Sequence, residues 1–156
     1  MAQEDEAHRR ATIQWIEDCG SWTHAVTITM SRTKYGVAPG NLEVLRRCRL
    51  YLSSINQRLF NHGRHRHGYR IGSMAFLGHG VNEDNPHVHW VIAAPPDENK
   101  EKFALFLRDI AARTAGIGAQ VDVQSYYGVG WIRYMCGHGF GGFIHQVAFR
   151  AKWPSR

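Results

Sequence analysis

Two histidines one residue apart, His87 and His89, carry the clearest chemical signal in this sequence. They stand in the segment NEDNPHVHWVIAAP, residues 82–95, where an acidic loop marked by a proline leads into an apolar run. Because alternate side chains of a strand point to the same face, the two imidazoles should share one face, about 6–7 Å apart along the strand. Two imidazoles at that spacing can bind one divalent metal ion.

A third metal ligand is expected one strand earlier. His79 ends the preceding apolar segment and would lie beside the pair if the chain turns through VNEDNP. Glu83 and Asp84, within that turn, are the alternatives, because carboxylates also bind divalent ions. A His-x-His pattern alone is short and also fits an ordinary pair of surface histidines. The third histidine at hairpin distance favours the metal site.

The chain is basic, which favours an anionic partner. It has 19 Lys and Arg against 13 Asp and Glu, a net charge of +6 and an isoelectric point near 9.5. Nucleic acid is the commonest partner for such an excess, although an ordinary basic enzyme would have the same composition. The positive charge is concentrated in the segments RTKYG, EVLRRCRLYL, QRLFNHGRHRHGYR and FRAKWPSR.

The length of 156 residues fits one folded domain, with residues 1–21 as a lead-in and residues 22–156 as the domain. No apolar run reaches the roughly 20 residues of a membrane span, and the charged N-terminus has no signal-peptide core. We therefore expect a cytoplasmic protein without a membrane partner. The three cysteines form no Cys-x-x-Cys pair, which argues against a disulfide framework and against a zinc ribbon.

Apolar periodicity predicts alternating strands and helices that could position these residues. Strands are expected over 23–30, 69–80, 87–95, 119–127 and 143–151, and helices over 41–61, 97–116 and 130–140. This order is that of the split βαβ plan, an α+β, ferredoxin-like antiparallel sheet with two long helices on one face. The opposite face of the sheet is expected to be free for a ligand.

Local signals add detail to this plan. Asn41 and Asp97 are the expected N-terminal caps of the two long helices. In the histidine strand, Val88, Trp90 and Ile92 alternate with the histidines and should therefore pack beneath the helices. The histidine pair would then point to the free face.

The segment PHVHWVI resembles the His-hydrophobic-His motif of HUH endonucleases, which include rolling-circle replication initiators, relaxases and small single-strand transposases. The resemblance covers roughly residues 22–150 and rests on the strand THAVTITM, the histidine strand and the downstream WIRYMCGH. It implies a ferredoxin-like palm with the histidine strand near its centre and a bound divalent ion, Mn²⁺ or Mg²⁺. It also implies single-stranded DNA or a DNA hairpin as substrate.

In this family a tyrosine on a later helix attacks a DNA phosphate and stays joined to the 5′ end. Tyr134, on the expected short helix beside Arg133, is the first choice, and Tyr127, at a strand end, is the alternative. Replication initiators often carry Tyr-x-x-Lys at this place, whereas this sequence reads YMCGH and has Gly137 instead of the lysine. The adjacent His138 could supply the missing contact to phosphate. No second tyrosine closely follows, which indicates the single-tyrosine type.

The basic segments should contact the phosphates of such a DNA strand. The expected DNA-binding residues are Arg32, Lys34, Arg64, Arg66, Arg70, Arg133 and His138. The expected function is DNA nicking and joining through a 5′-phosphotyrosine, with a host helicase as a possible partner. The alternative is a non-catalytic, ferredoxin-like nucleic-acid-binding module, which the missing lysine keeps open.

Overall fold

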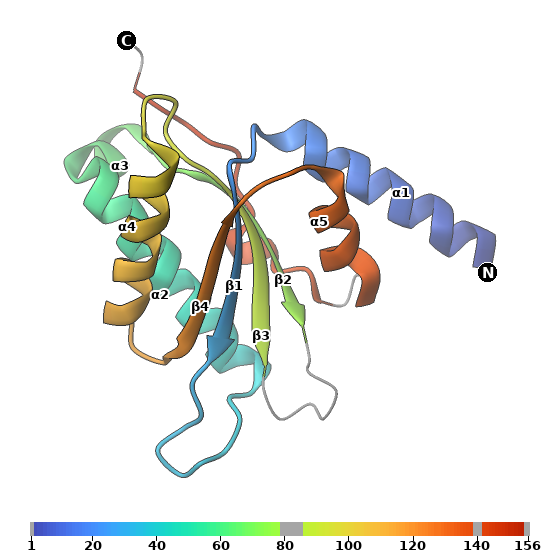
Figure 1. Ribbon diagram of the computed structural model, residues 1–156, viewed down its shortest axis with the longest axis horizontal. Helices are drawn as coiled ribbons and strands as arrows, with labels where there is room; N and C mark the ends of the chain where they lie inside the picture. The colour runs from blue at the N-terminus through green and yellow to red at the C-terminus, as the bar shows by residue number, and fades with distance from the viewer. Residues whose placement is uncertain (1, 79–85, 139–141, 155–156) are drawn as a thin grey trace.

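The computed structural model describes residues 2–78, 86–138 and 142–154 (Figure 1). Its helices and strands are α1 (Ala2–Cys19), β1 (His24–Met30), α2 (Asn41–Phe60), α3 (His62–His67), β2 (Gly72–Gly78), β3 (His87–Ala93), α4 (Lys100–Arg113), β4 (Ile117–Ser125) and α5 (Val129–Met135). Two short 3-10 turns, η1 (Cys136–His138) and η3 (His145–Val147), follow α5. The first four strands and the two long helices expected from the sequence are all present, with ends within three residues of the expected bounds.

The sheet has the strand order β2-β3-β1-β4, and each neighbouring pair is antiparallel. This is the ferredoxin-like order, so the expected α+β fold is confirmed. β1 and β3 are the two interior strands, which puts the histidine strand near the centre of the sheet. An interior strand is paired along both edges, and this pairing fixes which of its side chains point to each face.

Helices α2 and α4 cover one face of the sheet and enclose the main core (Figure 1). Val88, Trp90 and Ile92 of β3 point into this core and are fully buried, as the alternation predicts. The Trp90 ring packs edge-on against Tyr51 of α2, with ring centroids 5.5 Å apart. The Tyr51 hydroxyl donates to the carbonyl oxygen of Leu107, which ties α2 to α4.

The opposite face is not free, contrary to the expectation from the sequence, because α1 and α5 pack against part of it. The second core that they form contains Ile16, Cys19, Trp22, Met74, Phe76, Val91, Ala93, Ile132, Met135 and Cys136. The N-terminal residues expected as a lead-in thus supply a helix that contacts α5 (Figure 1). Most of the apolar residues of α1 lie in its second half, so its packing face is too short to stand out as a periodic pattern.

The expected final strand over 143–151 is wrong. This segment follows the edge of β2 but pairs with that side of the sheet only through isolated bridges, those of Phe143 and Phe149. The turn η3 interrupts it, and Ile144 and Val147 both point into the main core instead of alternating between faces. The segment therefore closes an edge of the core without extending the sheet as a regular strand.

The helix ends also differ from the sequence expectation. α2 begins at Asn41, but the preceding glycine is its cap residue and the asparagine side chain is not. α4 is capped by Asn99 and not by Asp97, because the Asn99 Oδ1 accepts from the Lys102 N–H at 3.0 Å. The segment NHGRHRHG was expected only to end α2, yet it forms α3 after Asn61, whose φ of 42° interrupts the helix.

A buried arginine connects the loops at the end of the sheet where β1 ends. Arg47, only 5% exposed, donates to the carbonyl oxygens of Ser31 and Gly116, which belong to two different loops. It also donates to the Glu43 carboxylate at 2.7 Å. Hydrogen bonds from Arg46 and Arg47 lower the pKa of Glu43 to about 2. The ion pair therefore stays charged across the physiological pH range and holds both loops against α2.

Candidate active site

The histidine pair lies where β3 begins, beside the end of β1 (Figure 1). In the strand register, His87 is opposite Gly78 of β2 and Thr29 of β1, and His89 is opposite Thr27 of β1. Directly opposite residues on neighbouring strands point to the same face. This face is the one that α1 and α5 cover in part.

The two imidazoles are in contact, as their spacing predicts. The ring centroids of His87 and His89 are 4.7 Å apart, and the ring planes are nearly perpendicular. His89 is buried, whereas His87 is partly exposed and forms the open side of the pair. A Cβ atom on Gly78 would come within 2.5 Å of the His87 Nε2, so the His87 ring occupies space that only a glycine leaves open.

Thr27 orients His89 and was missed in the sequence analysis. Its hydroxyl forms a hydrogen bond with the His89 Nδ1 at 3.0 Å. Such a partner fixes the ring and directs Nε2 away from the strand that holds the threonine. The signal was present in THAVTITM, where polar Thr27 and Thr29 alternate with the apolar residues. Asp122 of β4 is opposite Thr27 and is exposed, so it adds a carboxylate to the same face.

Tyr134 is the tyrosine that the fold brings to the histidine pair. Its ring centroid lies 5.0 Å from that of His89, and its side chain is 50% exposed. Trp131, one turn earlier in α5, contacts both of these rings. The Trp131 indole nitrogen donates to the carbonyl oxygen of Trp90 at 3.1 Å, which anchors α5 to β3 next to the pair. Tyr134 thus combines a fixed helix with access to solvent.

The other tyrosines of this region lie elsewhere. Tyr127 follows the end of β4, is 91% exposed, and makes no ring contact with the histidine pair in the described part of the chain. The Tyr126 hydroxyl donates to the Glu17 carboxylate at 3.1 Å. Burial and this bond raise the pKa of Tyr126 above its usual range, so its phenol stays protonated. The geometry favours Tyr134 over Tyr127, which was the alternative in the sequence analysis.

The expected third metal ligand lies outside the described residues, as do its two alternatives. His79 and the turn residues Glu83 and Asp84 are the residues concerned. Within the described ranges, no three His, Cys, Asp or Glu side chains converge to form a metal site. His87 and His89 supply two imidazole donors on one face, and Thr27 holds one nitrogen of His89. This donor set fits a divalent ion if one further ligand joins it.

Three of the expected DNA-binding residues flank the site. Arg32 and Lys34 are exposed in the loop after β1, at the end of the sheet that holds His87. Arg133 is exposed on α5, next to Tyr134. The side chain of His138 lies outside the described residues, although its backbone forms η1.

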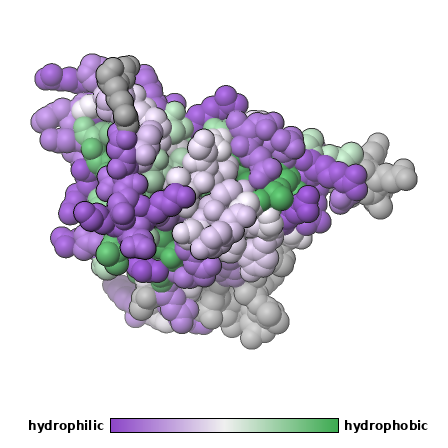
Figure 2. Space-filling model, turned by 45° about the horizontal axis from the view of Figure 1, so that its top comes forward, coloured by the Kyte–Doolittle hydropathy of each residue, from purple (hydrophilic) through white to green (hydrophobic). Residues whose placement is uncertain are grey.

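The densest basic cluster is not at the site. Arg64 and Arg66 belong to α3, and Arg70 precedes β2 at the end of the sheet opposite to His87. Helix α3 lies on the α2 side of the sheet, away from α5 (Figure 1). Figure 2 is turned toward this end of the molecule and shows many hydrophilic side chains around α3 and α4. These arginines therefore lie at the end of the sheet remote from the histidine pair.

Cys136, which follows Tyr134 closely, is not a nucleophile in this structure. Its thiol is 1% exposed and belongs to the second core. Burial raises the pKa of this thiol to about 11, although the nearby charge of Arg9 acts in the opposite direction. The thiol therefore stays protonated at neutral pH.

No family model, curated protein or solved structure matches this chain. The fold itself defines an α+β protein with a ferredoxin-like antiparallel sheet, and many functions occur on that plan. None of the helices in the described residues is both long and apolar enough to cross a membrane.

Proposed function

We propose that this chain is a metal-dependent endonuclease of the HUH type, which nicks and joins single-stranded DNA through a 5′-phosphotyrosine. The observation that carries the proposal is the contact between Tyr134 and the histidine pair, with ring centroids of Tyr134 and His89 5.0 Å apart. A tyrosine from a late helix and two histidines from an interior strand meet at one exposed place. Tyr134 is half exposed, so a role in core packing does not explain why it lies beside the histidines.

His87, His89 and His79 would hold the divalent ion in this proposal. With Nε2 of His89 turned to the ion, its Nδ1 carries the proton and donates to Thr27. Imidazole donors suit Mn²⁺ better than Mg²⁺, which prefers oxygen ligands. When bound, the ion would polarise the scissile phosphate and help to neutralise its charge.

Tyr134 would then act as the nucleophile. Its phenolic oxygen forms a bond to phosphorus while the bond between phosphorus and the 3′ oxygen breaks, and the phenolic proton ends on the released 3′ hydroxyl. The product is a 5′-phosphotyrosine, which retains an ester bond that the 3′ hydroxyl can attack to rejoin the strand. The flanking phosphates would bind to Arg133, which is next to Tyr134 in sequence, and to Arg32 and Lys34 in the loop after β1.

The decisive experiment incubates the protein with a pool of single-stranded DNA and Mn²⁺ and measures intact mass after denaturation. We expect a covalent adduct whose mass exceeds that of the protein by one DNA fragment. The adduct should disappear with a chelator and with Tyr134→Phe, and it should persist with the matched control Tyr127→Phe. An adduct that persists in Tyr134→Phe and is lost in Tyr127→Phe would move the nucleophile to Tyr127.

A second function, a non-catalytic nucleic-acid-binding module, is favoured by one observation. Gly137 stands where HUH replication initiators often carry lysine, so one expected phosphate contact is missing three residues after Tyr134. A binding module would keep its affinity for DNA when His87 or Tyr134 is replaced and would form no adduct with any DNA. That result would reject the endonuclease proposal in favour of the module.

A further inference from the structure

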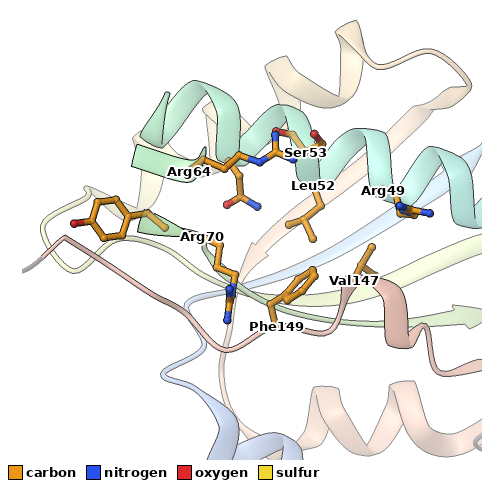
Figure 3. Close-up of a pocket in the computed structure, with 10 residues that line it drawn as sticks. Arg49, Leu52, Ser53, Arg64, Arg70, Val147 and Phe149 are labelled. Atoms are coloured by element: carbon orange, nitrogen blue, oxygen red, sulfur yellow. The ribbon is translucent and has the colours of Figure 1, made fainter. Parts of the chain in front are cut away.

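An arginine-lined cavity lies on the opposite side of the molecule from the histidine pair. It has a volume of about 330 Å³ and lies between α2, α3 and the C-terminal segment (Figure 3). Its charged residues are Arg49, Arg64 and Arg70, and no Asp or Glu is among the residues that line it. Arg64 and Arg70 come from the basic cluster that the fold separates from the candidate active site, and Arg49 comes from α2.

These three guanidinium groups differ from four other arginines of α2 and α4, which are paired with carboxylates. Arg46 and Arg47 are paired with one glutamate, and Arg58 and Arg113 are both close to Asp109. In contrast, no carboxylate among the described residues pairs with the three cavity arginines. A folded protein that leaves three neighbouring cations without a counterion creates a local positive potential, which attracts an anion.

The three arginines are held in different ways. Arg64 donates to the carbonyl oxygen of Ser53 at 3.1 Å through one of its nitrogens. Arg70 donates to the carbonyl oxygen of Arg150 through Nε, and its guanidinium lies over the ring of Phe149. Arg49 makes no hydrogen bond or ion pair within the described residues. Each group therefore retains N–H donors for a ligand, since a guanidinium has five.

The wall of the cavity also offers a fixed amide. Asn56 is 6% exposed, and its Oδ1 accepts from the backbone N–H of Ile71 at 2.9 Å. Because a backbone N–H can only donate, this bond identifies the oxygen and leaves Nδ2 as a donor on the other side of the amide. Ser53, which carries a hydroxyl group, also lines the cavity. Donors from arginine, amide and hydroxyl groups are the set that binds phosphate oxygens.

The surroundings of the cavity favour a chain of phosphates over a single ion. Two further cavities adjoin the first, and all three share Ser53 and Arg64 in their linings. Arg49 and Arg64 line the second cavity together with Arg46, and Arg64 and His65 line the third together with Arg58 and Arg113. The charges of Arg46, Arg58 and Arg113 are paired with Glu43 or Asp109. The arginine-lined surface thus continues on both sides of Arg64, along α2.

We propose that this surface binds successive backbone phosphates of a single-stranded DNA segment, with one phosphate in the cavity between Arg49, Arg64 and Arg70. It is a second DNA contact, on the α2 side of the sheet, and it goes beyond the proposed nicking reaction. A strand bound there stays attached to the protein while another part of the same strand lies at Tyr134. The site does not require the metal or the tyrosine.

The test measures the affinity of the protein for a fluorescent thymidine oligonucleotide of about 20 nucleotides, long enough to cover several contacts, by anisotropy at several salt concentrations. The variants are Arg49→Gln, Arg64→Gln and Arg70→Gln. The matched control is Arg10→Gln on α1, an exposed arginine paired with Glu6, which changes the net charge by the same amount. Because Arg49 makes no described hydrogen bond, Arg49→Gln tests the cavity with no loss of a structural contact.

Each cavity variant should lower the slope of log affinity against log salt by about 0.7, the value for one phosphate contact on a single strand. This slope corresponds to a roughly fivefold weaker affinity at 0.1 M salt. Arg10→Gln should leave the slope unchanged. An equal change of slope in all four variants would mean that only the net charge matters, and it would overturn the proposal. Unchanged slopes in the three cavity variants would also overturn it.

Two further arms identify the ligand. If the affinity for poly-glutamate falls in the three arginine variants as much as the affinity for the oligonucleotide, the cavity binds acidic protein segments and the DNA proposal fails. If the variants weaken the binding of inorganic phosphate but not that of the oligonucleotide, the cavity binds a free ion and the proposal also fails. His87→Ala separates this site from the nicking reaction, since it should remove adduct formation and keep the arginine-dependent binding. The two proposals can therefore fail independently.

Discussion

His24 on β1 and His89 on β3 lie on opposite faces of one sheet, and both are buried, with 1% and 4% of their surface exposed. On the α4 side, His24 forms hydrogen bonds through both ring nitrogens, with the Thr23 hydroxyl and the Lys100 carbonyl oxygen. On the α5 side, one nitrogen of His89 bonds to Thr27. The ring of His89 also contacts three partly exposed rings, those of His87, Trp131 and Tyr134.

The difference shows that burial alone does not assign a role to a histidine. The face under α2 and α4 is a closed core, in which polar groups bond to the protein itself and support the fold. The face under α1 and α5 is closed only in part, and its polar residues continue from the buried His89 to the exposed Asp122 and Tyr134. Substitutions on the first face should therefore change stability, and substitutions on the second should change activity.

Trp90→Ala should have the largest effect, because it removes the biggest fully buried side chain of the closed face. A buried aromatic replaced by alanine costs about 3–5 kcal/mol through lost burial and the cavity left behind. Urea denaturation followed by circular dichroism measures this loss. His87→Ala, on the same strand and the other face, is the control and should change stability by less than about 1 kcal/mol. Similar losses in both variants would contradict the distinction between the faces.

Arg47→Met should have the second-largest effect on stability. It leaves the carbonyl oxygens of Ser31 and Gly116 without the guanidinium, and one or two unsatisfied groups cost about 2–3 kcal/mol. Because the pKa of Glu43 is lowered to about 2, the pair stabilises the fold above pH 4.5, and this contribution is lost as the pH falls toward 2. The acid-dependent part of the stability should shrink in the variant. The exposed neighbour Arg46 gives the control Arg46→Met, which should also reduce the acid-dependent part, because Arg46 contributes most to the lowered pKa of Glu43. It should cost less stability at neutral pH, because the loop carbonyl oxygens of Ser31 and Gly116 keep their bonds to Arg47.

Thr27→Val tests the partly open face with little change of shape. It removes the hydroxyl that bonds to the His89 Nδ1 and keeps the volume of the side chain. Loss of such a supporting bond typically lowers metal affinity or activity by about 10–100-fold. Adduct yield as a function of Mn²⁺ concentration measures the effect, and denaturation measures stability in parallel. Thr29→Val, one pair further along β1, is the comparison, and an equal loss there would argue against a specific role of Thr27.

His24 should make the smallest of these contributions, through the pH dependence of stability. Burial lowers the pKa of His24 below its ordinary value of 6.5, so the unfolded chain takes up this proton at a higher pH than the folded protein does. Stability should therefore fall as the pH is lowered below about 6.5. His24→Gln should remove this component, and His65→Gln, an exposed histidine of α3, should leave it. Identical pH profiles for wild type and His24→Gln would refute this role of His24.

The sequence by itself determined the first four strands and the two long helices in their order along the chain, and the shared face of His87 and His89. Each of these follows from local periodicity, because a period of two or of 3.6 residues dictates which side chains face a core. The burial of Val88, Trp90 and Ile92 was predicted in the same way, and the structure confirms it. Tyr134 was preferred to Tyr127 because it stands on a short helix, but the sequence alone could not show which of the two tyrosines lies beside the histidine pair.

Only the tertiary structure decided which residues meet. The packing of α5 on the sheet brings Tyr134 to His89, and the strand pairing brings Thr27 to the same histidine. In the folded protein, α1 and α5 also cover part of the face expected to be free, and Arg64 and Arg70 lie on the far side of the molecule from the histidine pair. These outcomes depend on contacts between segments distant in sequence, and the geometry of such contacts is set by the whole core and not by any local pattern.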